Sequence, residues 1–208
     1  MMLYLASQSP RRQAILNDLG VRFDLLLPDQ TEDAEALEIQ LPNESAQAYV
    51  ARVTLNKIEA ARVRFKKRQL TFLPILCADT TVALTQSHRQ EILGKPTSHE
   101  DAVAMLTKLS NRSHQVYTAV ALIRSMDDQP EIIVSTTQVF FSELSAQTIQ
   151  AYVNTGEPMG KAGAYGIQGA GSCLIERIEG SYSGVMGLPI FETCQLLKKA
   201  SIPYILSV

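Results

Sequence analysis

Two adjacent arginines, Arg11 and Arg12, stand at the start of a predicted helix. Apolar residues at positions 3–6 come before them, and apolar residues then recur at helical spacing as far as Gly20. Ser9 is of a type that caps helices, just before the first helical turn. Arginines at this positive end of a helix cost a few tenths of a kcal/mol unless an anion binds there. The pattern therefore indicates a phosphate site, with a solvated basic turn as the alternative.

Two carboxylates stand where they could move protons or bind a metal ion. Asp79 follows the apolar run 73–78, and the carboxyl ends of strands in α/β folds gather catalytic groups. We therefore expect a general base or a metal ligand there, because residues 80–84 favour β-structure over the alternative of a helix cap. Glu32 belongs to the stretch 23–51, which has seven acids and no Lys or Arg. Such a stretch is usually a solvated loop, but near arginines it could bind a divalent cation.

Two lysines stand out by their positions in the predicted elements. Lys57 continues the apolar face of a helix predicted over residues 43–67, so its ammonium group either reaches out to solvent or meets an anion in a cleft. Lys95 stands between a predicted β segment and a predicted helix that starts after Ser98.

Gln168 lies in a segment, residues 160–171, that contains five glycines. The segment has neither the Gly-Lys-Ser/Thr of a P-loop nor the glycine spacing of a dinucleotide-binding turn. Its backbone can approach a flat ligand closely, and the Gln168 amide offers one donor edge and one acceptor edge. Glycines that serve only in turns are the equal alternative.

Composition narrows the classes of function. The 208 residues are 46% hydrophobic and 19% charged, with a net charge of −2, which is ordinary for a globular chain able to bury about 70% of its surface. A nucleic-acid partner is not expected, because the one basic cluster, residues 62–68, fits a solvated helix end.

Cysteine usage and hydropathy predict a cytoplasmic protein without a membrane partner. The chain has no Cys-x-x-Cys pair, no apolar stretch of 18 residues, and no signal-like segment before the first strand. The histidines lack the spacing of metal ligands and are expected at the surface or in loops. The cysteines are Cys77, Cys173 and Cys194, and the histidines are His88, His99 and His114.

Alternating strand and helix patterns predict an α/β fold without repeats or a flexible linker. Residues 116–124 and 132–141 are expected to form a hairpin. Strands are expected at 3–6, 21–27, 73–78, 116–124, 132–141, 173–178 and 204–207, a loop at 180–184, and helices at 10–19 and 43–67 and after Ser98, Ser145 and Pro189.

Five motifs, in this order, resemble those of the Maf family, and together they span nearly the whole chain. Several motifs in a family's order are far more specific than any one of them alone. The motifs are Leu5-Ala6-Ser7-Gln8-Ser9-Pro10-Arg11-Arg12, Ala78-Asp79-Thr80, Gly94-Lys95-Pro96, Lys161-Ala162-Gly163-Ala164-Tyr165-Gly166-Ile167-Gln168-Gly169, and Gly180-Ser181-Tyr182 with Val185-Met186-Gly187-Leu188-Pro189.

The resemblance implies an elongated α/β fold: a single domain over residues 1–208, with a mixed twisted β-sheet flanked by helices and two lobes around a central cleft. It implies a metal-dependent nucleoside triphosphate pyrophosphatase that cleaves between the α- and β-phosphates, uses Mg²⁺ or Mn²⁺, and belongs to a family historically linked to inhibition of septum formation. It also favours a homodimer, which the residues alone do not indicate.

The resemblance also assigns roles to residues. Asp79 matches the proton acceptor, and Arg12, Lys57 and Lys95 match cations that would stabilise charge on the phosphates. Arg11 and Thr80 match the branch that acts on dTTP and UTP. Residues matching substrate-binding positions are Ser7, Ser9, Arg11, Thr80 and Gln168, and the match for the metal ligand is Glu32.

Three departures from the family pattern stand out. Thr31 stands before Glu32 where the family usually has an acid, which bears on metal ligation. The turn over residues 85–91 is a few residues longer than is usual in the family. Ile58 stands after Lys57 where the family usually has a small residue. Two alternatives to a dTTP/UTP pyrophosphatase stay open. One is a nucleotide-sensing regulator of cell division without turnover, and the other is a purine-preferring pyrophosphatase of the ITP/GTP type.

Overall fold

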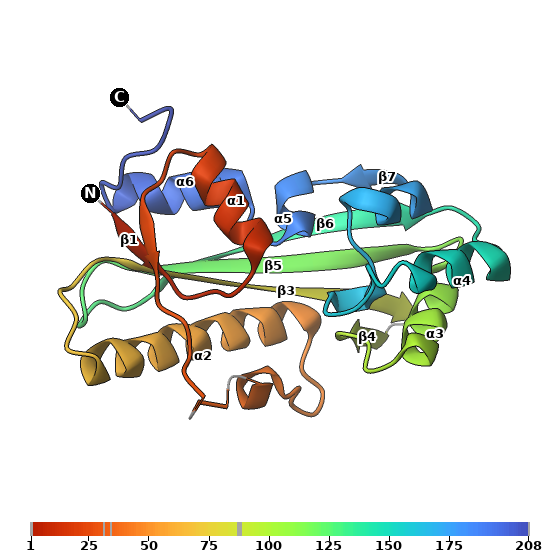
Figure 1. Ribbon diagram of the computed structural model, residues 1–208, viewed down its shortest axis with the longest axis horizontal. Helices are drawn as coiled ribbons and strands as arrows, with labels where there is room; N and C mark the ends of the chain where they lie inside the picture. Colours follow the sequence, from red (N-terminus) through yellow and green to blue (C-terminus); the bar gives the residue numbers. More distant parts are fainter. Residues whose placement is uncertain (1, 31, 34, 87–88, 208) are drawn as a thin grey trace. The chain divides into compact units, whose positions relative to one another are not determined.

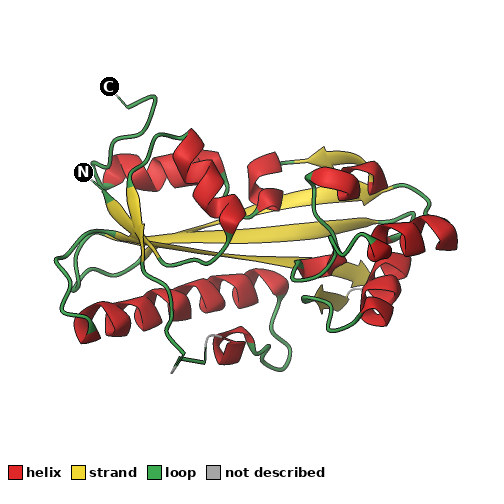
Figure 2. Ribbon diagram, viewed as in Figure 1, coloured by secondary structure: helices red, strands yellow, loops and turns green. Residues whose placement is uncertain are grey.

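The computed structural model describes residues 2–30, 32–33, 35–86 and 89–207, so Thr31 and His88 lie outside the described residues. The predicted α/β class is confirmed (Figures 1 and 2). The strands are β1 (Leu3–Leu5), β2 (Phe23–Leu25), β3 (Ile75–Gln86), β4 (Arg89–Leu93), β5 (Ser113–Ile123), β6 (Glu131–Phe141) and β7 (Ile175–Glu179). The helices are α1 (Pro10–Asp18), α2 (Ala46–Lys67), α3 (His99–Leu109), α4 (Ala146–Asn154), α5 (Tyr182–Met186) and α6 (Ile190–Lys199), with 3₁₀ turns η1 (Glu35–Glu38), η2 (Ala162–Ala164) and η3 (Gly169–Leu174).

The seven strands form one mixed sheet in the order β2-β1-β3-β5-β6-β7, with β4 paired to β3. β1 is parallel to both β2 and β3, whereas the pairs β3/β4 and β6/β7 are antiparallel. β5 and β6 are neighbours, as the expected hairpin requires. The turn predicted over residues 85–91 lies in the β3/β4 hairpin, but much of it is strand, because Thr85 pairs with Gln90 and Gln86 pairs with Arg89.

The chain divides into two compact units. Unit 1 consists of residues 1–79, 118–135 and 187–208, and unit 2 consists of residues 80–117 and 136–186. Strands β3, β5 and β6 each contribute residues to both units. Among the helices that the structure describes, none combines the length and the apolar character that a membrane span requires.

In unit 1, α2 packs on one face of the strands and α1 lies on the other face (Figure 1). Ile58 and Phe65, on one face of α2, belong to an apolar cluster with Tyr4 of β1 and with Ile75 and Cys77 of β3. Helix α2 begins after Ser45, whose hydroxyl accepts a hydrogen bond from the Ala48 amide, as expected for an N-cap. This packing fixes the rotation of α2 about its axis, and therefore the direction in which each of its polar residues points.

In unit 2, helices α3 and α4 share one apolar cluster with η2 and with the unit 2 ends of the sheet strands. Leu106 of α3 and Val153 of α4 are fully buried there, together with Val139 of β6. The predicted caps Ser98 and Ser145 both bond to backbone amides in the first turns of their helices. The glycine-rich segment thus rests on a well-packed core.

Four expectations about secondary structure or exposure are wrong. β3 does not end near Asp79, because the β-favouring residues 80–84 continue it to Gln86. Residues 182–186 form the short helix α5 in place of a loop. Residues 204–207 form a turn in place of a strand, closed by hydrogen bonds between Tyr204 and Ser207. His114 is a core residue, only 2% exposed.

Candidate active site

Arg12 is held by hydrogen bonds to two segments of unit 1, the loop after β1 and the segment before α6. Its Nε donates to the Gly187 carbonyl at 2.7 Å, and its Nη1 donates to Ser7 Oγ at 3.0 Å. Gly187 has a φ of +118°, which residues with a side chain rarely adopt. The orientation of its carbonyl toward Arg12 therefore requires glycine at this position. Burial lowers the pKa of Arg12 from its usual value, partly offset by the charge of Asp79, and the guanidinium remains a cation.

The start of α1 differs in detail from the expected cap. Ser9 occupies the N-cap position, and Pro10 begins the helix as predicted, but the Ser9 side chain makes no capping hydrogen bond. Instead, the Ser9 amide donates to Ser7 Oγ at 3.2 Å. Ser7 Oγ therefore connects the loop backbone to Arg12, and Arg11 lies beside them, partly buried, in the first turn.

Asp79 points toward α2 because of its place in β3. Side chains alternate between the faces of a strand, so Ile75, Cys77 and Asp79 share one face. Ile75 and Cys77 pack against α2, and Asp79 is next along the same row. Asp79 is 8% exposed. The predicted position at a strand end is wrong, because β3 continues to Gln86.

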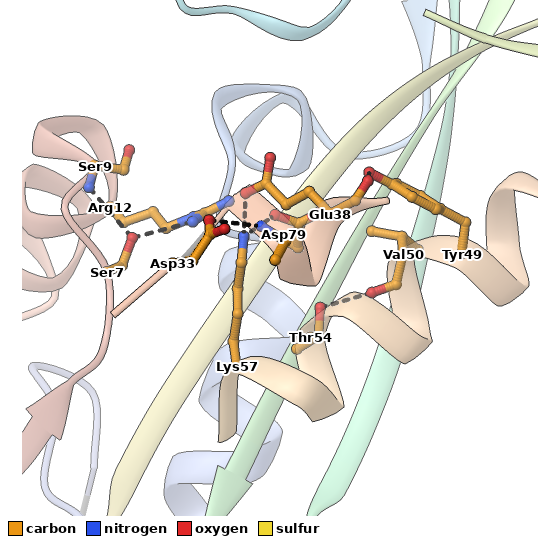
Figure 3. A network of polar contacts seen from close by, with 11 residues as sticks. Ser7, Ser9, Arg12, Asp33, Glu38, Tyr49, Val50, Thr54, Lys57 and Asp79 are labelled. Atoms are coloured by element: carbon orange, nitrogen blue, oxygen red, sulfur yellow. Dashed lines mark hydrogen bonds and ion pairs between the residues drawn. The ribbon is translucent and has the colours of Figure 1, made fainter. Parts of the chain in front are cut away.

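Lys57 lies between two carboxylates, as Figure 3 shows. Its Nζ donates to Asp79 Oδ1 at 2.6 Å and to Glu38 Oε1 at 2.8 Å. Burial alone would lower the pKa of Lys57, but the charges of Asp79 and Glu38 outweigh burial and raise it. Of the two alternatives for Lys57, contact with anions is therefore the one observed, and the anions are side chains of the protein.

Glu38 is the site residue that the sequence analysis missed. It ends η1, and its backbone carbonyl accepts a hydrogen bond from the Tyr49 hydroxyl of α2 at 2.8 Å (Figure 3). Burial, reinforced by the charges of Asp79 and Glu38, raises the pKa of Tyr49 to about 12. Tyr49 thus remains a hydrogen-bond donor at neutral pH. Nothing in the sequence distinguishes Glu38 from the other acids of its stretch.

Glu32, the predicted metal ligand, is bound elsewhere. Its Oε2 accepts from Arg64 Nη2 at 2.6 Å, and Arg64 Nε lies 2.9 and 3.1 Å from the two oxygens. Hydrogen bonds from Arg64 lower the pKa of the Glu32 carboxyl. Arg64 also donates to the Leu26 carbonyl, so this ion pair secures the acidic loop to α2. Much of the basic cluster 62–68 is likewise used in contacts within unit 1, as Lys67 with Asp29 illustrates.

The other predicted site residues belong to unit 2. Thr80 follows Asp79 in β3 and lies on the opposite face of that strand. Lys95 is exposed, and the carbonyl of the preceding Gly94 accepts a hydrogen bond from the Gly163 amide at 3.0 Å. Gln168 is exposed in the glycine-rich segment, after the buried Ile167.

The structure thus brings together the unit 1 residues Ser7, Arg12, Lys57 and Asp79, and it adds Glu38. Among the described residues, no three His, Cys, Asp or Glu side chains come close enough together to hold a metal ion by themselves. What unit 1 offers is an ammonium group, Lys57, hydrogen-bonded to two carboxylates, and a guanidinium, Arg12, that feels the charge of one of them, Asp79. Such a set can bind phosphate oxygens and accept a proton.

Comparisons with known proteins agree with these motifs. The family model described as "Maf-like protein" matches residues 2–200. The dTTP/UTP pyrophosphatase of Burkholderia orbicola (strain AU 1054) is 53% identical over 203 residues, covering 98% of this chain and 95% of that protein. The protein of the same name from Albidiferax ferrireducens is 54% identical over 196 residues, covering 94% of this chain and 95% of that protein.

A solved structure, the Ham1 protein of Staphylococcus aureus, is 15% identical with a TM-score of 0.42, and the match covers 84% of this chain and 80% of that one. This likeness is too weak to bear on function. The family match over residues 2–200 and relatives above 50% identity over nearly the full length are decisive. This chain belongs to the Maf family.

Proposed function

We propose that this protein is a nucleoside triphosphate pyrophosphatase that hydrolyses dTTP and UTP to the monophosphate and pyrophosphate, and so clears nucleotides from the cellular pool. The observation that carries the proposal is the contact between Lys57 and Asp79 beside Arg12. Relatives more than 50% identical that are named dTTP/UTP pyrophosphatase support the substrate class.

The reaction needs a base for water and cations for phosphate. Asp79 accepts the proton of a water molecule that attacks the α-phosphorus, and the bond from the α-phosphorus to the bridging oxygen breaks. The hydrogen bond from Lys57 orients the Asp79 carboxylate. Arg12 and Lys57 stabilise charge on the phosphates and on the departing pyrophosphate, a role that the family resemblance also gives to Lys95.

The carboxylates of unit 1 fit a divalent cation. Mg²⁺ is usually bound by one or two carboxylates together with phosphate oxygens of the substrate, so three protein ligands are not required. Glu38 and Asp79 offer two carboxylates within hydrogen-bond distance of one ammonium group. We assign the metal to these two residues rather than to Glu32, because Arg64 occupies both oxygens of Glu32. Bound Mg²⁺ or Mn²⁺ would offset the negative charge of the phosphates.

We assign base recognition to Gln168 of the glycine-rich segment. Gln168 presents one donor edge and one acceptor edge, which suit the polar edge of a uracil or thymine ring. Ser7 and Ser9 contribute polar groups near the helix start, and Arg11 and Thr80 match the pyrimidine branch of the family. The exposed side chain of Gln168 supports this role, because a base-reading amide must be accessible.

Pyrophosphate release from dTTP, UTP, CTP, dGTP, ITP and 7-methyl-GTP, measured with Mg²⁺, with Mn²⁺ and with chelator, tests the proposal. We expect metal-dependent turnover with dTTP and UTP preferred. A purine preference would retain the reaction but replace the substrate assignment. Tight nucleotide binding without pyrophosphate release would instead favour the regulator of cell division.

We also propose a cytoplasmic homodimer that binds neither nucleic acid nor membrane. The three cysteines are free thiols, which fits a reducing compartment. Light scattering on the purified protein measures the oligomeric state, and a monomeric mass at micromolar concentration would remove the dimer from the proposal.

A further inference from the structure

The carboxylate of Glu157 in unit 2 is bound by the glycine-rich segment, and the residue is partly buried. Its Oε1 accepts hydrogen bonds from the Tyr152 hydroxyl at 2.9 Å and from the Gly171 amide at 3.0 Å. Its Oε2 accepts from the Ala170 amide at 3.0 Å. Glu157 thus satisfies backbone donors of η3 that would otherwise need water or a ligand.

The same pair of side chains also fixes the segment before Gln168. The Tyr152 hydroxyl, which donates to Glu157, accepts a hydrogen bond from the Gly166 amide at 3.1 Å. Gln168 therefore stands between two backbone stretches that are bound to Tyr152 and Glu157. The neighbouring Ile167 is buried and Gln168 is exposed, so Gln168 presents its side chain from an anchored turn.

Two glycines are needed for this close approach. A Cβ on Gly169, whose φ is +70°, would lie 2.7 Å from Glu157 Oε2. A Cβ on Gly171 would lie 2.2 Å from the Gly166 carbonyl oxygen and 2.7 Å from the Tyr152 hydroxyl oxygen. These contacts are shorter than side chains tolerate. The glycines therefore serve for more than the turn itself, because they also let the backbone approach the Glu157 carboxylate.

The charge of Glu157 persists at neutral pH. Burial alone would raise the pKa of the carboxyl, but hydrogen bonds from Gly171, Tyr152 and Ala170 outweigh burial and lower it. Lys161 adds its charge, and its ammonium donates to the Glu157 carbonyl. An ionised carboxylate makes stronger hydrogen bonds to amides than a neutral group does, so the anchor is a firm one.

We propose that Glu157 is a specificity-determining positioning residue, which holds the turn of Gln168 in the conformation that recognises a pyrimidine base. The inference rests on the proposed function, because it requires Gln168 to contact the base. Glu157 itself touches no substrate. Its effect reaches the substrate through the orientation of Gln168, where a displacement of about 1 Å is enough to cost much of the activity.

The test compares Glu157→Gln with wild type on dTTP and dGTP. The amide isostere keeps the shape but loses the charge, and its NH₂ group opposes a backbone donor. We expect kcat/KM for dTTP to fall about tenfold, chiefly through a higher KM, and kcat/KM for dGTP to fall much less. Glu176→Gln, an exposed change on β7 of the same unit, is the matched control and leaves both values unchanged.

A double-mutant cycle with Gln168→Ala shows whether Glu157 acts through Gln168. Two residues that act as one unit are not additive, so the double variant should discriminate dTTP from dGTP no less than Gln168→Ala alone. Additive losses, or an equal loss on both nucleotides in Glu157→Gln, would overturn the inference. If Glu157→Gln does not fold, Tyr152→Phe removes the hydroxyl that joins Glu157 to the Gly166 amide without a charge change, and the same ratio of kcat/KM values decides.

The wild-type enzyme separates the two possible failures. No dTTP preference in wild type contradicts the proposed function. A wild-type preference for dTTP that Glu157→Gln leaves intact contradicts only the role of Glu157.

Discussion

At the scale of single residues, the chemistry of unit 1 is defined by Lys57, which is partly buried and bound to two carboxylates. It donates to Asp79 and Glu38, and their combined charge raises its pKa despite burial. A triphosphate entering this site would compete with both carboxylates for the ammonium group. Asp79 and Glu38 can separate in function, because only Asp79 is anchored in the sheet, whereas Glu38 ends a short 3₁₀ turn.

Replacement of Asp79 by Asn tests the general base. The amide keeps the shape of the side chain but cannot accept the proton, so we expect kcat for dTTP to fall about 10²- to 10⁴-fold. Circular dichroism should show an unchanged fold. Asp24→Asn, an exposed aspartate on β2, is the matched control. Turnover near that of wild type in folded Asp79→Asn would remove Asp79 from the mechanism.

Replacement of Glu38 by Gln tests the metal assignment. Loss of one of two carboxylates should raise the Mg²⁺ concentration for half-maximal activity about tenfold, with most of kcat recovered at saturating Mg²⁺. A metal titration of initial rates measures this effect, with the exposed Glu143→Gln as control. An unchanged titration midpoint for Glu38→Gln, and a shifted one for Glu32→Gln, would return the metal to Glu32.

The sequence predicted Arg12, Lys57 and Asp79 because each stands at a recognisable place in an element: a helix start, an apolar helix face and an apolar strand. Glu38 could not be predicted, because its stretch has no periodicity that distinguishes one acid from another. Its role depends on a long-range contact, the hydroxyl of Tyr49 with its carbonyl. The pairing of Glu32 with Arg64 could not be predicted for the same reason, since it links residues 32 positions apart.

At the scale of elements, helix starts were the most predictable feature. Ser98 and Ser145 accept hydrogen bonds from backbone amides of the first turns of their helices. A serine just before a stretch with helical periodicity can be recognised in the sequence alone. The extension of β3 was present in its β-favouring residues but was obscured by the polar Asp79-Thr80 pair in the middle. The short α5 and the final turn depend on tertiary contacts, such as the Ile205 amide with the Leu19 carbonyl, that no local pattern encodes.

Two serine caps predict different stabilities. Ser98 accepts a hydrogen bond from the Asp101 amide at 3.1 Å, so Ser98→Ala should lower the free energy of unfolding by about 1 kcal/mol. Ser9 makes no such bond, so Ser9→Ala should lower it by only a few tenths of a kcal/mol. Equilibrium urea unfolding measures both. Equal losses would show that cap geometry does not distinguish the two helices.

At the scale of the whole molecule, a buried histidine predicts acid sensitivity. Burial lowers the pKa of His114 to about 4, and its Nε2 lies 2.8 Å from the Tyr165 hydroxyl. The unfolded chain has an ordinary histidine pKa near 6.5 and binds the proton that the folded state excludes. Stability is therefore complete above about pH 6.5 and decreases as the pH falls toward 4.

We expect the free energy of unfolding to fall by about 2 kcal/mol between pH 7 and pH 5 from His114 alone. Urea unfolding of wild type and His114→Gln at both pH values measures this contribution, because the variant lacks the titrating group. The exposed His99→Gln should keep the full pH dependence. The same pH dependence in His114→Gln as in wild type would contradict the prediction.

The division into units also belongs to this scale, and it was not predictable from composition. The chain passes between the units after Asp79, Tyr117, Ser135 and Met186, in segments with no linker-like composition. Apolar periodicity predicts which residues are buried, but it does not say which of two cores they join. The α/β class followed from the alternating strand and helix patterns and the mixed sheet from the family resemblance, whereas the assignment of segments to units required the three-dimensional contacts.

The hydrogen bond from Arg12 to the Gly187 carbonyl joins groups 175 residues apart. A ribosome has therefore synthesised nearly all of the protein before this arginine can be held in place. A nascent chain that has not yet reached Gly187 carries Ser7, Lys57 and Asp79 without the completed cluster. A chain that ends before Gly187 therefore lacks the acceptor of the Arg12 Nε hydrogen bond.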